Sequence, residues 1–423
     1  MGRLRTLGTR AAARWGALSG PRSDALLYGA SGLFALGLGL FSREPAQARW
    51  GLLAVPAYVT GAVLALLLAR RARAGLLGRG LLLGLVILGA VAIPLGLEAR
   101  WRHLDPGASF AQPEVSVIER AGSNLSQGKD PYRAYVHNGH LVDAVKGVPP
   151  FESFFPYFPL MGVFGLPSAE THRSGGLTDA RIVMSLMTLA TSALALGLLR
   201  LERDRKLRVA QILIALPTGA LFLSTGGDDM PILALSLLGV AALQRRSNYV
   251  AGISLGLASA MKLTAWPVAA GALLVARNSQ GRSGARRIAA LVTAIVAVTV
   301  IPFALKNPGS FIANVFSFPL GLAGVRSPAA SALPGHILTT LWAPLGHVLA
   351  PLALLGLGIF GARYLRRHWP IDLSQMLVLL GVAFSVMILS ASATRIGYVV
   401  YPLNFFLWSR VLVPVSQRVP ELV

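Results

Sequence analysis

Cysteine is absent from the 423 residues, and charged side chains are scarce at 13%. Without cysteine the chain has no disulfide, no thiol chemistry and no thiolate metal ligand. A soluble globular domain carries about 25% charged residues, so this chain has too few to cover a water-exposed surface. Acidic residues are the rarest charged class, 17 against 39 lysines and arginines. These shortages exclude a water-soluble globular enzyme.

Long apolar stretches fill the chain instead, which is 54% hydrophobic. A membrane-spanning helix needs about 20 mostly apolar residues, so the sequence predicts an all-α polytopic integral membrane protein with about twelve spans. Its 45 glycines and 26 prolines follow no collagen-like period. Nine clear spans are expected at residues 25–42, 51–69, 81–97, 182–199, 209–224, 288–305, 341–362, 373–390 and 396–412. Three shorter ones are expected at 230–243, 249–261 and 264–276.

The placement of basic residues predicts the orientation. A strongly positive net charge, here +22, is common in nucleic-acid-binding proteins. In an apolar chain, however, arginine more often marks the cytoplasmic ends of membrane helices. We therefore expect no nucleic-acid partner. With twelve spans and cytoplasmic N- and C-termini, most basic residues fall inside and most carboxylates outside. The basic clusters concerned lie at residues 3–22, 70–79, 200–208, 245–246, 277–287, 363–367 and 410–418.

The sequence predicts one integral membrane domain over residues 1–423, with an extracytoplasmic loop at 98–156. Residues 157–166 are apolar but too short to span, and a full crossing there would exchange the sides of all later basic loops. We therefore expect a re-entrant segment, or a helix at the membrane rim. Loops of this length are usually functional, although a plain extracytoplasmic cap is the alternative. The loop carries Asp105, Glu114, Glu119, Asp130, Asp143, Glu152, His103, His137 and His140.

Two polar groups near helix ends are expected to carry function. Asp228 and Asp229 are adjacent carboxylates at membrane depth, where charge is costly. The alternative is that Asp229 merely caps the next helix. Lys262, with Trp266 close by, and Arg395 lie on the outer side, where each could hold a lipid phosphate. For the lysine, snorkelling to the interface is the alternative.

Carboxylates, isolated cations and aromatic residues thus map to one face of the membrane. That combination suits an enzyme that takes a phosphate-linked donor from the outer leaflet, with a carboxylate removing a proton from an acceptor hydroxyl. No nucleotide-binding or zinc-protease motif is present, and His137 with His140 is weak evidence for a metal, so neither cofactor nor metal is expected. A transporter or lipid-linked-sugar flippase is the rival, but no internal duplication is visible.

Short motifs follow one another along the chain after an acidic residue in the outer loop. They are Gly-Lys-Asp-Pro-Tyr at 128–132, Phe-Pro-Tyr-Phe-Pro-Leu at 155–160, Gly-Asp-Asp at 227–229, Gly-Leu-Ala-x-Ala-x-Lys ending at Lys262, and Arg395-x-x-Tyr398. Their order resembles glycosyltransferase family 87 of the GT-C superfamily, the bacterial polyprenyl-phosphate-mannose-dependent mannosyltransferases. Where that family usually has aspartate this chain carries Glu114, and residues 155–159 replace the usual Tyr-Pro-Pro.

The resemblance implies an inverting transfer of a hexose, expected to be mannose, from a polyprenyl phosphate to a glycolipid or glycan acceptor outside the bacterial plasma membrane. Glu114 is then the expected base, Asp228 or Asp229 orients sugar or acceptor, and Lys262 and Arg395 contact the lipid phosphate. A non-catalytic member of the fold in envelope assembly is a further alternative. Tyr132, Tyr157, Trp266 and Tyr398 are the remaining expected substrate-binding residues.

Overall fold

A computed structural model of the whole chain describes residues 20–70, 75–106, 110–171, 175–325, 329 and 331–412. The chain packs as two compact units, one made of Met1–Phe110 with Leu201–Gly227, the other of Ala111–Arg200 with Asp228–Val423. Both termini and the residues at 71–74, on which part of the predicted orientation depends, lie outside the described residues. The single domain and the sidedness therefore remain predictions.

The regular elements in the described part of the first unit are all helices. Its elements are α2 (Pro21–Phe41), α3 (Pro45–Arg70), α4 (Leu76–Ile87), η1 (Leu88–Ala92), α5 (Ile93–Leu104), α9 (Arg203–Ala210), η5 (Gln211–Ala215) and α10 (Pro217–Thr225). A buried ion pair ties α4 to α2, because Arg79 Nε donates to Asp24 Oδ2 at 2.6 Å. Gln211 Nε2 donates to the other oxygen of the same carboxylate at 3.0 Å. Charge at this depth is tolerated because it is paired.

The second unit contains the expected candidate residues. Its early elements are α6 (Pro113–Ser126), β1 (Tyr135–His137), β2 (His140–Val142), η2 (Pro150–Ser153), η3 (Pro159–Gly165), α7 (Leu166–Thr171), η4 (Gly176–Thr178) and α8 (Ala180–Leu198). Then come α11 (Asp229–Gln244), α12 (Asn248–Ser259), η6 (Leu263–Ala265), α13 (Trp266–Lys306), α14 (Pro308–Ile312), η7 (Ala313–Ser317), α15 (Pro334–Leu341), α16 (Leu345–His368), α17 (Leu373–Ser390), η8 (Ile396–Val399) and α18 (Val400–Val411). β1 and β2 form an antiparallel hairpin.

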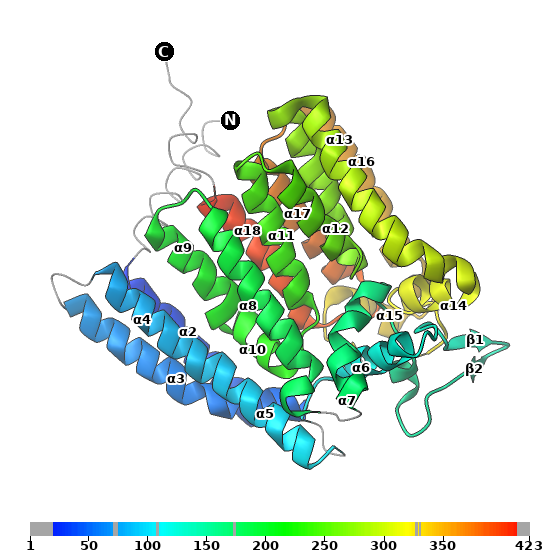
Figure 1. Cartoon of the computed structure of the whole chain (residues 1–423), viewed down its shortest axis with the longest axis horizontal. Helices are drawn as coiled ribbons and strands as arrows, with labels where there is room; N and C mark the ends of the chain where they lie inside the picture. The colour runs from blue at the N-terminus through cyan, green and yellow to red at the C-terminus, as the bar shows by residue number, and fades with distance from the viewer. Residues whose placement is uncertain are drawn as a thin grey trace. The chain divides into compact units, whose positions relative to one another are not determined.

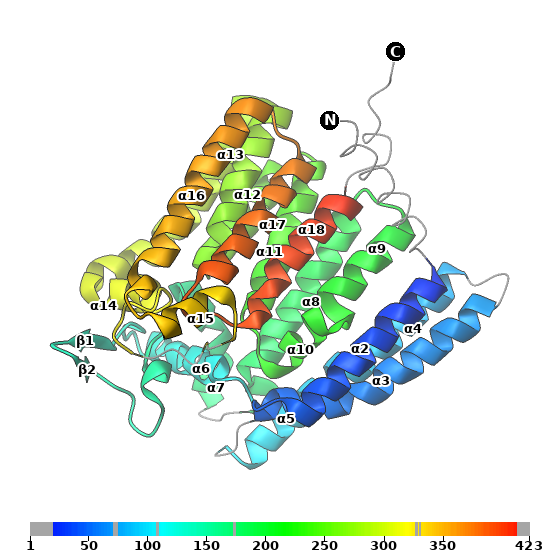
Figure 2. The ribbon, with the colours of Figure 1, turned by 180° about the vertical axis from the view of Figure 1, so that it is seen from behind.

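Within the second unit the long helices run side by side, and the short elements gather at one end of them. Figures 1 and 2 both show α8, α11, α12, α13, α16, α17 and α18 as a bundle, with α6, α7, α14, α15 and the hairpin at its end. The hairpin and α6 belong to the loop predicted at 98–156. The arrangement therefore places the loop residues of this unit at the bundle end where α14 and α15 also lie.

Membrane character is confirmed, and the number of spans is not. Seven helices in the described part are long and apolar enough to cross a membrane, or eight if the bent pair Arg203–Ala215 and Pro217–Thr225 is one span. Each predicted span overlaps a helix, but α11, α12 and α18 are shorter than a typical spanning helix. α13 is two helices joined at Gly281, whose φ of 74° breaks the helical path. This break separates the two spans expected at 264–276 and 288–305.

Close backbone contact fixes α6 against the segment that follows the loop. α6 packs on η3, the apolar stretch judged too short to span, and η3 is a 3-10 helix of 7 residues. A side chain at Gly122 would overlap the backbone of Gly165, and one at Gly165 would overlap the backbone of Ile118 and Glu119. Only glycine permits this approach at both positions. The crossing holds in place the helix that carries Glu114.

Candidate active site

Glu114 lies in the first turn of α6, directly after Pro113. Proline suits this position because its missing N–H would have no helical partner, and a carboxylate here faces the positive end of the helix dipole. Glu114 Oε1 accepts a contact from Arg395 Nη1 at 2.6 Å. Glu114 Oε2 is buried, and no hydrogen-bonding partner for it is found among the described residues. One carboxylate oxygen is therefore anchored while the other can accept a proton or a hydrogen bond.

Asp228 and Asp229 share one cation. Lys262 Nζ lies 2.5 Å from Asp228 Oδ2 and 2.5 Å from Asp229 Oδ1. All three side chains are nearly buried. Asp228 is the residue before α11, and neither aspartate side chain caps that helix. The alternative that Asp229 serves as an N-cap is thus wrong, because its carboxylate is turned to Lys262 and Tyr401 instead.

Three tyrosines complete the surroundings of Lys262. Tyr401 donates its hydroxyl to Asp229 Oδ1 at 2.6 Å and lies 2.8 Å from Thr264 Oγ1. The rings of Tyr157 and Tyr398 lie with their centres 5.4 and 5.7 Å from Lys262 Nζ. These distances allow cation–π attraction. The lysine is held by two carboxylates and two rings, which fixes its ammonium group in position.

The two ion-paired groups belong to one site. Tyr157 lies within electrostatic range of Glu114, Asp228 and Lys262. Tyr398 lies within electrostatic range of both Lys262 and Arg395. Five ionisable groups expected from the sequence therefore converge at the bundle end of the second unit. They are supplied by α6, by α11 with the residue before it, and by two further connecting segments. Three carboxylates face two cations in this arrangement.

Tyr132 and Trp266, also expected to bind substrate, occupy different surroundings. Tyr132 is fully buried and donates its hydroxyl to the carbonyl oxygen of Tyr157 at 2.7 Å, so it reaches the site only through Tyr157. Trp266 is 44% exposed, stacks on Phe158 and donates Nε1 to the carbonyl oxygen of Ser259 at 3.0 Å. Their substrate-binding roles remain predictions.

The loop motif at 128–132 is a structural turn in this chain. Asp130 Oδ1 accepts a hydrogen bond from the Tyr132 backbone N–H at 2.9 Å. Burial raises the pKa of Asp130, and this hydrogen bond and the charge of Lys306 act in the opposite direction. The turn directs Tyr132 inward, where its hydroxyl fixes the backbone at Tyr157. Through that contact the motif positions one of the rings over Lys262.

No cluster of three potential metal ligands occurs among the residues that the structure describes. His137 and His140 pair across the exposed end of the β hairpin. The absence of a metal or cofactor in the reaction remains an expectation from the sequence.

Sequence reasoning missed Tyr401, Thr264 and Arg120. Tyr401 follows Tyr398 by three residues at the start of α18, and this spacing places both on one helix face. The spacing could therefore have identified Tyr401 as a neighbour of Tyr398 in the site. Thr264 has no comparable signal, because its contact with Tyr401 exists only in the folded chain. Arg120 follows Glu114 on α6 and pairs with Glu152 across the loop, at 3.8 Å between Nη2 and Oε2.

Fold and site define a polytopic membrane protein with a paired-charge site at one end of a helical bundle. The sequence model of glycosyltransferase family 87 matches residues 155–391. That match covers more than half of the chain, so the chain belongs to glycosyltransferase family 87 and is a membrane glycosyltransferase. The matched segment contains Asp228, Asp229 and Lys262, whereas Glu114 and Arg395 lie on either side of it. No curated protein matches the chain.

Proposed function

We propose that this glycosyltransferase transfers mannose from a polyprenyl-phosphate donor to a glycolipid or glycan acceptor on the extracytoplasmic side of a bacterial plasma membrane. The observation that carries the proposal is the state of Glu114. Its Oε1 is held by Arg395, while Oε2 is buried without a partner among the described residues. A positioned carboxylate with one available oxygen is what a general base requires.

In the proposed reaction the acceptor hydroxyl gives its proton to Glu114 Oε2. The acceptor oxygen attacks C1 of the donor sugar as the bond between C1 and the phosphate oxygen breaks, and the bond's electron pair leaves with the polyprenyl phosphate. Attack from the opposite face inverts the configuration in one displacement. Neither a covalent enzyme intermediate nor a nucleotide sugar is needed.

Arg395 is the cation best placed to contact the leaving phosphate. Its side chain is 29% exposed, whereas that of Lys262 is 12% exposed and already compensates two carboxylates. Guanidinium also binds phosphate in a bidentate manner. In this proposal Lys262 fixes Asp228 and Asp229, which orient the sugar or acceptor hydroxyls, and it lies deeper than the phosphate contact.

The test is Glu114→Gln in the purified, reconstituted full chain, supplied with labelled polyprenyl-phosphate-mannose and glycolipid acceptors. We expect transfer to fall by about 10²-fold or more, because general-base catalysis contributes about 10²–10⁴-fold. Glu114→Asp keeps the carboxylate and is expected to retain part of the activity. Retained transfer by the glutamine variant would remove Glu114 from the base role. Movement of the labelled lipid across the bilayer without transfer would favour a flippase.

A further inference from the structure

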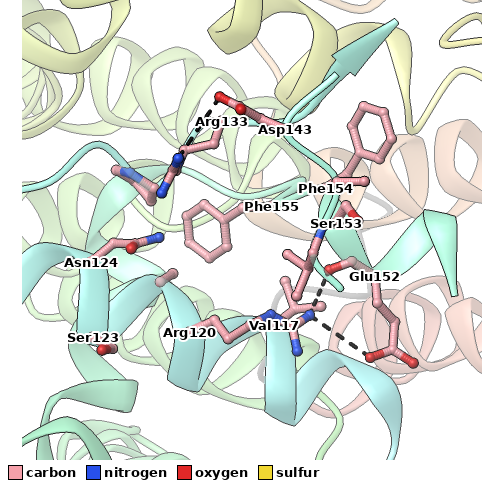
Figure 3. A pocket seen from close by; sticks show the side chains of 14 residues that line it. Val117, Arg120, Ser123, Asn124, Arg133, Asp143, Glu152, Ser153, Phe154 and Phe155 are labelled. Carbon is pink, nitrogen blue, oxygen red and sulfur yellow. Dashed lines mark hydrogen bonds and ion pairs between the residues drawn. The ribbon is translucent and has the colours of Figure 1, made fainter. Parts of the chain in front are cut away.

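A cavity runs along α6 beyond Glu114. Its volume is about 360 Å³, within the range of about 300–1,000 Å³ usual for small-ligand sites. The helix contributes Val117, Arg120, Ala121, Ser123 and Asn124. The opposite wall comes from the segments just before and just after the hairpin, and from the end of η2 with the two residues that follow it. The side chains that line the cavity from these segments are seen together in Figure 3.

Two of the α6 residues that line the cavity share a helix face with the proposed base. Val117 and Ala121 follow Glu114 by three and seven residues, the spacing that keeps side chains on one helix face. At 1.5 Å per residue, Asn124 lies about 15 Å along the helix from Glu114. Glu152, on the facing wall, is close enough to Glu114 for their charges to interact. The cavity therefore extends away from the site along the helix that holds the base.

The charges that line the cavity are balanced by one another. Arg133 lies 3.9 Å from Asp143, and Arg120 lies 3.8 Å from Glu152 while also donating to the Glu152 carbonyl oxygen at 2.5 Å. Figure 3 shows the two pairs with the ring of Phe155 seen between them. Two cations against two carboxylates leave no excess charge for a phosphate to neutralise. The cavity favours a neutral ligand that both donates and accepts hydrogen bonds.

An amide on the cavity wall completes this chemistry. The Asn124 side chain lines the cavity, and within the described part of the chain it makes no hydrogen bond to protein. An amide offers two donors and an acceptor, which matches vicinal hydroxyl groups. The floor is apolar and buried, formed by Pro131, Phe154 and Phe155. Polar walls over an apolar floor suit a sugar ring, with hydroxyls at its rim and C–H groups on its faces.

We propose that this cavity binds a sugar unit of the acceptor glycan that lies beyond the unit being glycosylated. The inference rests on the proposed function, because it places the reacting hydroxyl at Glu114 and the rest of the glycan along α6. It predicts that an acceptor with several neutral sugar units is preferred over one with a single unit. The residues that set this preference are Asn124 and the cavity wall at Ala144, which is exposed and open to substitution.

The test uses the reconstituted full chain with lipid acceptors that carry one or three neutral hexoses. Asn124→Ala removes the amide, and Ala144→Trp fills the cavity from its exposed wall. Loss of one hydrogen bond costs about 0.5–1.5 kcal/mol, so we expect Asn124→Ala to raise KM for the three-sugar acceptor by about 2–12-fold. Ala144→Trp occupies the space of the sugar unit itself, so we expect it to raise that KM by at least as much. KM for the one-sugar acceptor and kcat should not change. Lys146→Ala, an exposed loop change outside the cavity, is the matched control. Equal effects on both acceptors, or no effect on either, would overturn the inference.

A second measurement separates this inference from the proposed function. Binding of soluble trisaccharides of mannose, glucose and galactose is measured by saturation-transfer NMR in the absence of donor. Binding that Ala144→Trp abolishes, in a chain without detectable transfer, would sustain the cavity and refute the proposed function. Transfer without cavity-dependent trisaccharide binding would sustain the function and refute the cavity. Binding of inorganic phosphate in place of sugar would also refute it.

Discussion

Lys262 is expected to be the most costly single charge to remove from this protein. Its Nζ lies 2.5 Å from each of two carboxylates, and the three side chains are 12%, 9% and 13% exposed. Lys262→Met would leave Asp228 and Asp229 buried and adjacent without a cation. Removing one partner of a buried ion pair costs about 3–5 kcal/mol, because the remaining charge is uncompensated. We expect the free energy of unfolding to fall by that amount, and transfer to be lost.

The cause can be separated from simple loss of packing. In the triple variant Lys262→Met, Asp228→Asn, Asp229→Asn, no charge remains to be compensated, and replacing a whole buried ion pair is often neutral. We therefore expect most of the lost stability to return, while transfer stays absent. Lys129→Met, at an exposed lysine, should change stability by no more than about 0.5 kcal/mol.

The measurement is denaturant-induced unfolding in detergent micelles, followed by tryptophan fluorescence and by size-exclusion chromatography of the remaining folded fraction. A Lys262→Met variant within about 1 kcal/mol of the wild-type chain would refute the reasoning, since the pair would then be solvated and weak. A triple variant as unstable as the single one would also refute it. In that case shape, and not charge, would account for the loss.

Three further predictions concern the supports of the site. Tyr401→Phe removes a buried hydrogen bond to Asp229 and should cost about 1.5–3 kcal/mol in the same unfolding assay, with reduced transfer. Glu119 Oε1 accepts a hydrogen bond from the Ala180 N–H, and this bond ties α6 to α8. Glu119→Ala should therefore lower the free energy of unfolding by about 1–3 kcal/mol and lower kcat. Glu119→Gln keeps an acceptor oxygen and should restore both the stability and kcat. Burial raises the pKa of Glu152 above its ordinary value of 4.5, so the folded chain releases this proton at a higher pH than the unfolded chain does. The folded chain therefore loses stability as the pH rises above 4.5. Glu152→Gln removes this titration, so the apparent Tm should fall less steeply with pH.

The helices and the grouping of the candidate residues were accessible to sequence reasoning. Hydrophobic stretches located the helices because a span must be apolar over its whole length. Charges at helix ends stood out for the same reason, since an apolar chain has few of them and each needs a partner. Lys262 and Arg395 were selected in this way, whereas Glu114 was selected among the loop carboxylates through the resemblance to glycosyltransferase family 87. The structure places them in one site, and their catalytic roles remain proposals.

The pairing within the site was not accessible. Which carboxylate meets which cation depends on the rotation of α6 and α11 and on the path of the segment before η8, and hydrophobic periodicity fixes neither. Arg395 was expected to face phosphate, and its partner Glu114 comes from a loop far earlier in the chain. Aspartate is a residue type favoured at helix N-caps, but the Asp229 side chain contacts Lys262 and Tyr401 instead. Tertiary contact outweighed local propensity at that position.

Among the five ionisable groups of the site, one buried atom in the described part of the chain departs from the rule that buried polar groups are paired. Arg395 satisfies one oxygen of Glu114, and the aspartates satisfy Lys262, but Glu114 Oε2 has no partner among the described residues. A buried acceptor left unpaired costs about 1–3 kcal/mol. The cost disappears when a hydroxyl donates to that oxygen, which is the geometry that proton transfer requires. Among the five ionisable groups of the site, as far as the structure describes the chain, Glu114 Oε2 is the buried atom without a partner, so in this proposal the acceptor hydroxyl completes the site. The free energy released at that contact contributes to orienting the hydroxyl for attack.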